Sequence, residues 1–177
     1  MVTDPGQVRR LAESKEVENL RFRRHLHAHK VPIEPFQILA HEIERQIDCT
    51  KCANCCRRMI VDVTRAEIET IAEYLGLTFD EVLLKHIDSE PGDSGHKIMR
   101  TEHNACTFLD GNLCMIYEAR PAACREFPHV TVGAHTLGAR LESVCRHSSV
   151  CPILYNALEA YEARVGYHPH PQAGARH

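Results

Sequence analysis

The sequence predicts a small, mostly helical α+β single domain in which short strands surround a cysteine-rich site. Three observations lead to this class: apolar residues recur at helical spacing in several segments, short apolar runs between residues 96 and 116 are separated by turn residues, and nine cysteines lie between Cys49 and Cys151. Of the 177 residues, 44% are hydrophobic and 25% charged, which is an ordinary globular composition and gives little reason to expect a second domain.

The N-terminal segment 1–35 is expected to form a charged helical arm. Its apolar residues, such as Val8, Leu11 and Leu20, fit a helical face only in part. The stretch 31–35, VPIEP, ends this helix because each proline disfavours helical geometry in the residue before it. The pattern FQILAHEIERQI, which starts at residue 36, predicts a helix with one buried stripe that leads to the first cysteine.

Two capping boxes predict a helical hairpin after the first cysteines. Residues 59–63, MIVDV, read as a short strand, and the box at 64–67, TRAE, opens a helix that ends at Gly76. The second box, TFDE at 78–81, opens the partner helix. Both boxes place a threonine three residues before a glutamate, so each satisfies otherwise unpaired backbone N–H groups at a helix start.

The C-terminal half is expected to alternate short strands and short helices. Residues 96–101 and 105–116 predict two or three strands with a turn at Asp110 and Gly111, between Cys106 and Cys114. The other expected segments are a polar loop over 88–95, helices over 118–127, 137–144 and 152–165, and a disordered tail over 167–177. The cysteine-cluster domain is therefore predicted over 36–166.

The composition limits which kinds of binding partner and which cellular compartment are expected. The N-terminus has no apolar run typical of a signal peptide, and no later stretch approaches a membrane span, so we expect a cytoplasmic protein. The formal net charge is -3 with the 13 histidines neutral, so neither nucleic acid nor a membrane is an expected partner. In a reducing compartment nine cysteines are better explained by metal or redox chemistry than by disulfides.

The stretch 49–56, CTKCANCC, places four thiols in eight residues. A C-x2-C pair in a tight turn lets two side chains converge on one metal centre while the backbone amides between them donate to the sulfurs. Cys55 extends this to a C-x2-C-x2-C run like that of bacterial iron-sulfur proteins. Cys56 follows at once, and in an extended chain it would point away from Cys55, so that the two would not share one ion.

The CTKCANCC run supplies three or four ligands of a metal centre. The other ligands must come from the C-terminal half, where five more cysteines lie. Two all-thiolate zinc sites need eight cysteines, whereas one four-iron cluster needs four. Cations close to the cysteines would offset part of the thiolate charge, although simple surface solvation explains them equally well; they are Lys51, Arg57, Arg58, Arg120, Arg125 and Arg146.

These motifs in their order resemble the YkgJ-type cysteine-cluster family, known for a zinc- or iron-chelating CxxCxxCC domain. The resemblance rests on CTKCANCC, on the segment 106–128, CTFLDGNLCMIYEARPAACREFP, and on Cys151 followed by Pro152. It implies metal binding more firmly than any reaction. The metal ligands that it implies are Cys49, Cys52, Cys55, Cys56, Cys106, Cys114, Cys124 and Cys151, and it leaves Cys145, the ninth cysteine, without a counterpart.

Histidines offer a second kind of metal ligand. His25 and His29 share a helical face at the spacing of zinc-binding helices, but no glutamate follows His25 as in the zincins, so a solvated helix is the simpler interpretation. His103 lies three residues before Cys106 and could add one imidazole to the cysteine centre.

Three functions follow as hypotheses. The first is a cysteine-bound iron-sulfur centre, for instance a four-iron cluster, for redox or structural purposes. The second is a non-enzymatic zinc module that binds a protein partner. The third is metal sensing or delivery through the ninth thiol and the histidines. The sequence assigns no catalytic residue and leaves open whether the protein is an enzyme; phosphate-binding glycine loops and nucleophile elbows are absent.

Overall fold

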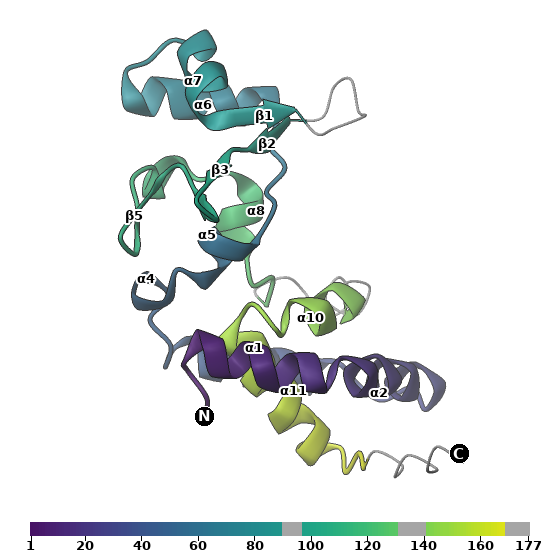
Figure 1. Ribbon diagram of the computed structural model, residues 1–177. Helices are drawn as coiled ribbons and strands as arrows, with labels where there is room; N and C mark the ends of the chain where they lie inside the picture. Colours follow the sequence, from purple (N-terminus) through teal and green to yellow (C-terminus); the bar gives the residue numbers. More distant parts are fainter. Residues whose placement is uncertain (90–96, 131–140, 169–177) are drawn as a thin grey trace, which may run out of the picture. The chain divides into compact units, whose positions relative to one another are not determined.

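The computed structural model describes residues 1–89, 97–130 and 141–168. The chain divides into two compact units (Figure 1). Unit 1 comprises Met1–Ile47 and Pro128–His177, and unit 2 comprises Asp48–Phe127. Most described residues are helical and the strands form short antiparallel pairs, so the predicted α+β class is confirmed. The segment boundaries predicted after residues 35 and 166 stay predictions.

Unit 1 is a group of helices. Asp4 caps the first helix by accepting from the backbone N–H of Gln7, and Pro5 occupies its first turn, where a missing N–H does no harm. The chain bends at Lys15 between the first two helices. Among its described residues, unit 1 has the helices α1 (Pro5–Ser14), α2 (Glu16–Ala28), α3 (Glu34–Glu44), α10 (Leu141–His147) and α11 (Pro152–Arg164).

The charged N-terminal arm packs against the C-terminal helices of its own unit. Helix α1 contacts α11, and α2 contacts α10. Val8 and Phe22 are fully buried, which explains why only a few apolar positions on this segment follow a helical face. The Tyr161 ring, on α11, meets Phe22 and Phe36 edge-on with centroids 5.8 and 5.7 Å apart, and its hydroxyl donates to the Pro32 carbonyl.

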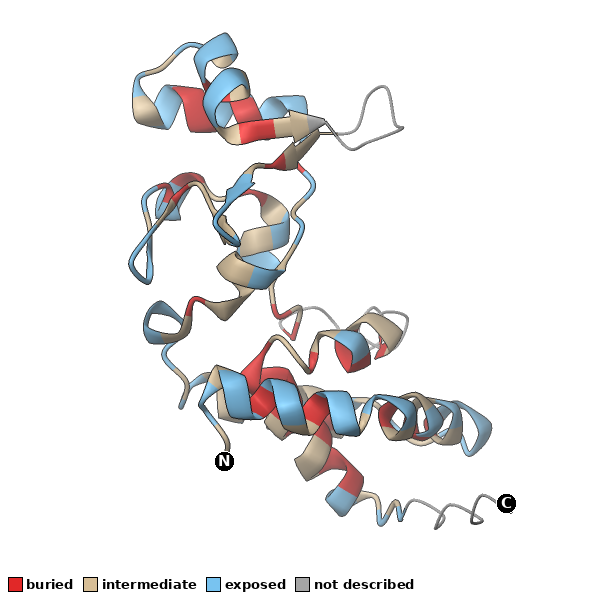
Figure 2. Cartoon of the chain, in the orientation of Figure 1, coloured by how far each residue is buried: buried red, intermediate tan, exposed pale blue. Residues whose placement is uncertain are grey.

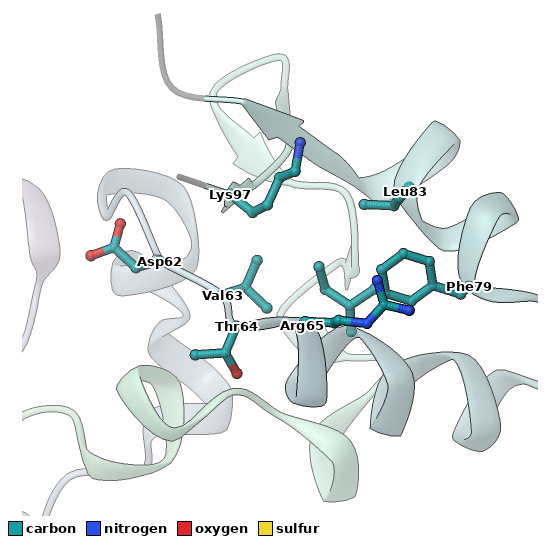
Figure 3. A pocket seen from close by; sticks show the side chains of 8 residues that line it. Asp62, Val63, Thr64, Arg65, Phe79, Leu83 and Lys97 are labelled. Atoms are coloured by element: carbon teal, nitrogen blue, oxygen red, sulfur yellow. The ribbon is translucent and has the colours of Figure 1, made fainter. Parts of the chain in front are cut away.

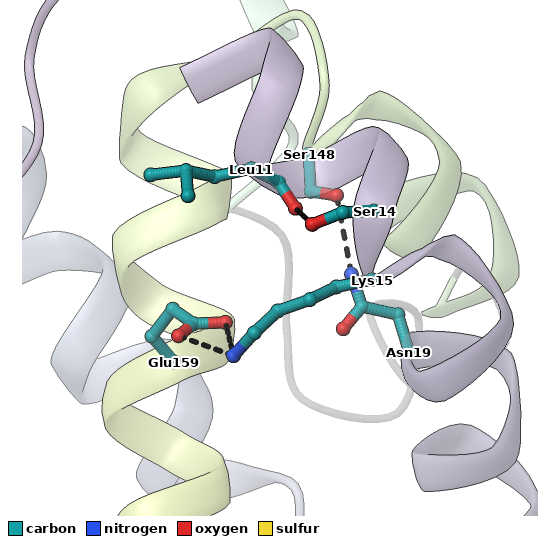
Figure 4. Close-up of polar contacts among 6 residues, drawn as sticks. All are labelled: Leu11, Ser14, Lys15, Asn19, Ser148 and Glu159. Atoms are coloured by element: carbon teal, nitrogen blue, oxygen red, sulfur yellow. Dashed lines mark hydrogen bonds and ion pairs between the residues drawn. The ribbon is translucent and has the colours of Figure 1, made fainter. Parts of the chain in front are cut away.

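A polar layer lies beside this core (Figure 4). The Lys15 ammonium donates to both carboxylate oxygens of Glu159, at 2.8 and 2.7 Å. One turn further along α2, the buried Asn19 amide donates to the hydroxyl of Ser148 at 3.4 Å (Figure 4). The carboxylate oxygen Oε1 of Glu162 is buried without a hydrogen-bond partner. Burial first, and then the charge of Glu159, raise the pKa of Glu162 to about 7.

Unit 2 contains the helical hairpin that the two capping boxes predict. Thr64 and Glu67 form the first box at the start of α6 (Arg65–Leu75), which ends at Gly76 with a φ of 67°. Thr78 and Glu81 form the second at the start of α7 (Phe79–His86). Both predicted boxes are confirmed.

The strands of unit 2 form three two-stranded antiparallel sheets within residues 48–89 and 97–127. They pair β1 (Ile87–Ser89) with β2 (Lys97–Met99), β3 (Thr101–Glu102) with β4 (Ala105–Cys106), and β5 (Leu109–Asp110) with β6 (Leu113–Cys114). The strand predicted over 59–63 is reduced to a single bridge between Asp62 and Ile98. The chain then forms a 3-10 turn, η1 (Tyr117–Ala119), and α8 (Ala122–Glu126).

The core of unit 2 joins the helical hairpin to the strands. Ile68 and Ile71 on α6 pack in one cluster with Phe108 and Ile116, and each of the four is at most 1% exposed. Cys106 and Cys114 pack against this cluster and are themselves half-buried. Figure 2 shows the buried stretches of the helical hairpin in red. The cysteines are therefore anchored on a hydrophobic core rather than carried by a loose loop.

An open hollow of about 540 Å³ lies beside the helical hairpin (Figure 3). Its walls are mostly apolar, and the Arg65 guanidinium lies over the Phe79 ring at 4.5 Å from the ring centroid. Its lining consists of Asp62, Val63, Thr64, Arg65, Ile68, Phe79, Leu83 and Lys97. This lining includes no cysteine, so the hollow is distinct from the cysteine cluster.

Candidate metal centre

The CTKCANCC stretch folds into two short helical turns joined by a left-handed residue. Helix α4 (Cys49–Cys52) is capped by Asp48, and α5 (Asn54–Arg58) carries Cys55 and Cys56. Between them Ala53 has a φ of 47°, a conformation that disfavours any side chain larger than that of glycine. The buried Ala53 backbone N–H donates to the Cys49 carbonyl at 3.0 Å. This strained turn reverses the chain between the two pairs of cysteines.

Cys55 and Cys56 lie on a helical turn with their sulfur atoms 4.0 Å apart. The expectation that they point in opposite directions is therefore wrong, because it assumed an extended chain, whereas successive residues on a helix diverge by only about 100°. Two sulfurs bound to one tetrahedral zinc ion at about 2.3 Å each lie about 3.8 Å apart. The observed separation allows both thiols to approach a single ion.

Cys106 and Cys114 occupy equivalent positions at the ends of β4 and β6. Each sulfur accepts a hydrogen bond from the backbone N–H two residues further on, that of Phe108 for Cys106 and that of Ile116 for Cys114. Backbone N–H groups aimed at sulfur stabilise a thiolate and orient it toward a metal. Because Phe108 and Ile116 are buried in the core, these donors are held in place.

Arg57 fastens the first cysteine run to the β5–β6 turn. Its guanidinium donates to the backbone carbonyls of Cys52 and Ala53, at 3.3 and 3.2 Å. The same group donates to the carbonyl of Gly111 at 2.6 Å and to the side-chain oxygen of Asn112 at 2.8 Å. The Asn112 amide in turn donates to the carbonyl of Lys51 at 3.0 Å. These contacts bring two cysteine-bearing segments together although they lie 55 residues apart in the chain.

Glu67 positions the helix that carries Cys124. One of its carboxylate oxygens closes the capping box with Thr64, and the other accepts from the backbone N–H of Ala122, the first residue of α8, at 2.7 Å. Burial acts to raise the pKa of Glu67, but the hydrogen bonds from Thr64 and Ala122 outweigh it, and the pKa is lowered. The ionised carboxylate therefore fixes the start of α8 on the helical hairpin.

The thiols of four cysteines interact electrostatically around Cys56. The hydrogen bond with Cys55, followed by the charges of Arg57 and Arg120, lowers the pKa of Cys56 to about 7 against the opposing effect of burial. Burial, and then the thiols of Cys56, Cys106 and Cys114, raise the pKa of Cys124 to about 12. Burial also raises the pKa of Cys106 and Cys114. The Cys56 thiol can therefore lose its proton near neutral pH, whereas the thiols of Cys106, Cys114 and Cys124 need a bound cation to do so.

Arg120 adds a second positive charge to this group, besides that of Arg57. Its guanidinium lies over the Tyr117 ring, 3.4 Å from the centroid, and donates to the Tyr117 carbonyl. Its charge helps to lower the pKa of Cys56 and partly opposes the rise that burial causes in the pKa of Cys114 and Cys124. The expected role of such cations, offsetting thiolate charge, is therefore supported for Arg120 and Arg57, whereas Arg58 is exposed.

The structure distributes the predicted ligands over both units. Unit 2 holds Cys49, Cys52, Cys55, Cys56, Cys106, Cys114 and Cys124, and unit 1 holds Cys151, which is buried at the N-cap of α11. None of the nine cysteines, all of them within the described ranges, is in a disulfide. His103 is exposed at the turn between β3 and β4, with a φ of 50° that belongs to the turn.

Cys145 differs from the predicted ligands. It is 3% exposed on α10, and its sulfur donates to the backbone carbonyl of Asn19 at 3.6 Å. Burial raises its pKa to about 12. A buried neutral thiol of this kind is inert, so Cys145 does not supply the labile thiol of the metal-delivery hypothesis.

The donor chemistry of the Cys56 group fits a soft or borderline metal. Thiolates select zinc, copper(I) and iron-sulfur clusters, and N–H donors already face two of the sulfurs. Within residues 1–89, 97–130 and 141–168, no three side chains of the metal-binding types already stand in a closed ligand shell. The thiols of the Cys56 group therefore interact electrostatically without forming a ligand set of three around one point.

Sequence reasoning missed the positioning residues of this site. Arg57 was notable only as one of six cations near the cysteines, and Glu67 only as part of a capping box. Asn112, beside the turn at Asp110 and Gly111, carried no signal of its own. Their second partners lie more than 50 residues away in the chain, so no local pattern could indicate them.

Comparison with known proteins gives a partial match to an uncharacterized protein and a match to a family. No helix among the described residues has the length and apolar character needed to cross a membrane. No solved structure matches the chain. An uncharacterized protein of Methanocaldococcus jannaschii is 36% identical over 83 residues, which cover 46% of this chain and 43% of that protein, so the match spans less than half of either.

The family match covers the whole cysteine region. The CxxCxxCC family, described as a "Putative zinc- or iron-chelating domain", matches residues 48–152. This interval includes both halves of the predicted ligand set and confirms the resemblance seen in the sequence. Since it spans more than half of the 177 residues, the chain belongs to the CxxCxxCC family of cysteine-cluster proteins.

Proposed function

We propose that the protein holds a metal centre on the thiols gathered around Cys56. The observation that carries this proposal is the arrangement of Cys106 and Cys114, each of which accepts from a backbone N–H held in the core. Cys56 and Cys124 complete the group that interacts electrostatically. Isolated buried thiols gain little from such donors, whereas a metal-bound thiolate is stabilised by them. Cys49, Cys52 and Cys55 are the further ligands that we propose in unit 2, and Cys151, in unit 1, stays a predicted ligand.

An iron-sulfur cluster is the occupant that we propose first. The C-x2-C-x2-C run resembles that of cluster-binding proteins, and seven cysteines in unit 2 exceed the four that one zinc ion binds. When bound, such a cluster supplies one-electron transfer. The chain itself contributes thiolates, the N–H donors to sulfur, and the charges of Arg57 and Arg120, which favour the reduced and more negative site.

A zinc ion is the second candidate, and a different observation favours it. The 4.0 Å between the sulfurs of Cys55 and Cys56 is close to the separation of two thiolates on one tetrahedral ion. In a four-iron cluster each thiolate binds a different iron atom, which requires the sulfurs to be further apart. A zinc ion would make the centre structural and the protein an interaction module without redox chemistry.

One experiment separates the two occupants. The protein is purified without oxygen, and iron, zinc and acid-labile sulfide are measured per chain together with the visible spectrum. Stoichiometric iron and sulfide, with a visible absorption that dithionite bleaches, support the cluster. Stoichiometric zinc without sulfide supports the second candidate. A full-length protein that contains no stoichiometric metal after anaerobic purification would overturn the metal centre itself.

The proposal also sets the compartment and the partners. Thiolate ligands persist where thiols are kept reduced, so we place the protein in the cytoplasm. A redox centre needs an electron-exchange partner protein, whereas a zinc module needs a protein to bind. Neither nucleic acid nor a membrane has a role in this proposal.

A further inference from the structure

The C-terminal end of α2 brings two histidine rings together. His25 lies in the last turn and His29 is the C-cap residue, four positions later. Their ring centroids are 4.1 Å apart, and the ring planes differ by 31°. The i, i+4 spacing places both rings on one face of the helix, which is the spacing of zinc-binding helices. Small rotations about the side-chain bonds would aim both rings at one ion.

A backbone contact selects the tautomer of the neutral His29 ring. Its Nδ1 atom lies 3.0 Å from the carbonyl oxygen of His25. A carbonyl can only accept, so Nδ1 carries the proton and Nε2 keeps its lone pair. A ligand histidine in a metal site typically donates its other N–H to a carbonyl or carboxylate in this way. His29 is also exposed, so the outward Nε2 can be reached from solvent.

The surroundings of His25 support the same role. The Tyr167 ring packs against the His25 ring at 5.1 Å and against Phe22 at 4.8 Å, which holds His25 from the side of the core. The end of a 13-residue helix also carries a partial negative charge from its unpaired carbonyls, which favours a bound cation. Every one of these residues belongs to unit 1.

We infer that His25 and His29 form a second, exchangeable site for a borderline divalent cation such as Zn²⁺, Ni²⁺ or Cu²⁺. Imidazole suits these ions, and the hard cations Mg²⁺ and Ca²⁺ prefer oxygen ligands. Since no third metal-binding side chain completes the site among the described residues, water fills the other positions. Open coordination positions distinguish this site from a closed structural one and make its ion exchangeable. The inference does not depend on what the cysteine centre binds.

The test uses the full-length protein after its cysteine centre has been loaded and its metal content measured. Ni²⁺ is then titrated by isothermal calorimetry into the wild type and into three variants, His25→Ala, His29→Ala and His27→Ala. His27 is the matched control, because it lies on the same helix, is exposed, and points about 200° away from His25. Alanine is the best helix former, so α2 is retained in all three, which circular dichroism verifies.

The wild type and His27→Ala are expected to bind one further equivalent of Ni²⁺ that His25→Ala and His29→Ala lose. Cu²⁺ added to the same proteins should show two equatorial nitrogens by electron paramagnetic resonance in the wild type and one in either single variant. The inference is overturned if the wild type takes up no further equivalent. It is overturned equally if both variants retain the equivalent, which would assign the binding to other histidines.

Discussion

The Arg57 guanidinium donates to the backbone carbonyl of Gly111 at 2.6 Å, while the same side chain holds the carbonyls of Cys52 and Ala53. A single planar group thus joins the strained turn between the first cysteines to the hairpin that separates Cys106 from Cys114. Four hydrogen bonds from one charged fork define both position and angle, which a point charge on a flexible stem does not.

Arg57→Lys should therefore loosen the cysteine centre although it keeps the charge. We expect a loss of about 2 kcal/mol in the free energy of unfolding, since hydrogen bonds to a charged group each contribute about 1.5–3 kcal/mol and lysine retains only some of them. Metal content per chain should fall with it. Urea unfolding and metal analysis of the purified variant are the measurements.

Arg58→Lys is the control for this change, because Arg58 is the exposed neighbour. It should leave both quantities within error of the wild type. If Arg57→Lys also leaves both quantities unchanged, the charge near the cysteines, and not the fork of Arg57, is what the centre needs.

The two capping boxes provide a second matched pair. Glu67→Ala and Glu81→Ala each remove one capping box and should lower the free energy of unfolding. Only Glu67 also accepts from Ala122, so its loss should destabilise unit 2 by about 1 kcal/mol more. Glu67→Ala should also weaken metal retention, because the hydrogen bond that holds the start of α8, the helix that carries Cys124, is lost.

The two variants are compared by urea unfolding and by the rate at which a chelator removes the bound metal. We expect faster removal from Glu67→Ala and a wild-type rate for Glu81→Ala. If both variants lose metal at one rate, the contact between Glu67 and α8 has no part in positioning Cys124.

The ligand set predicts different outcomes for different cysteines. Cys52→Ser and Cys124→Ser should lower metal content and stability, since serine is a poor ligand for soft metals. Cys145→Ser should leave the metal content unchanged, because Cys145 is buried in unit 1 and hydrogen-bonded to Asn19. The measurement is metal per chain after identical anaerobic purification, and the same loss in all three variants would refute the assignment.

The buried Glu162 predicts a specific dependence of stability on pH. Its pKa in the folded protein is about 7, against an ordinary value of 4.5. As the pH rises from 4.5 toward 7, the unfolded chain loses this proton first, so the folded state is progressively destabilised, and the full penalty is present above pH 7. Below pH 4.5 both states are protonated and the penalty disappears.

Glu162→Gln should therefore be more stable than the wild type at about pH 8 and close to it at about pH 4.5. The check is the difference in urea midpoint between variant and wild type at the two pH values, a difference in which the titration of the cysteines cancels. A constant difference at both pH values would show that the carboxylate does not titrate as its burial implies.

Local patterns in the sequence determined much of this protein. The capping boxes at Thr64 and Thr78 specify their helices because donor and acceptor lie three residues apart. The chelate spacing of CTKCANCC and the order of the later cysteines determined the metal chemistry and the family, since ligand type and spacing are properties of the chain itself. The C-terminal helix, predicted over 152–165, forms as α11 (Pro152–Arg164) for the same local reasons.

Only the tertiary structure decided how these pieces act together. Whether Cys55 and Cys56 point apart or together depends on the backbone between them, which is helical because the left-handed turn at Ala53 and the contacts of Arg57 hold it so. The burial of Cys145 depends on α2, a helix more than 100 residues earlier in the chain. Local propensity and ligand spacing are read along the chain, but burial and long-range hydrogen bonds depend on which distant segments meet, and this is set by the packing of the whole fold.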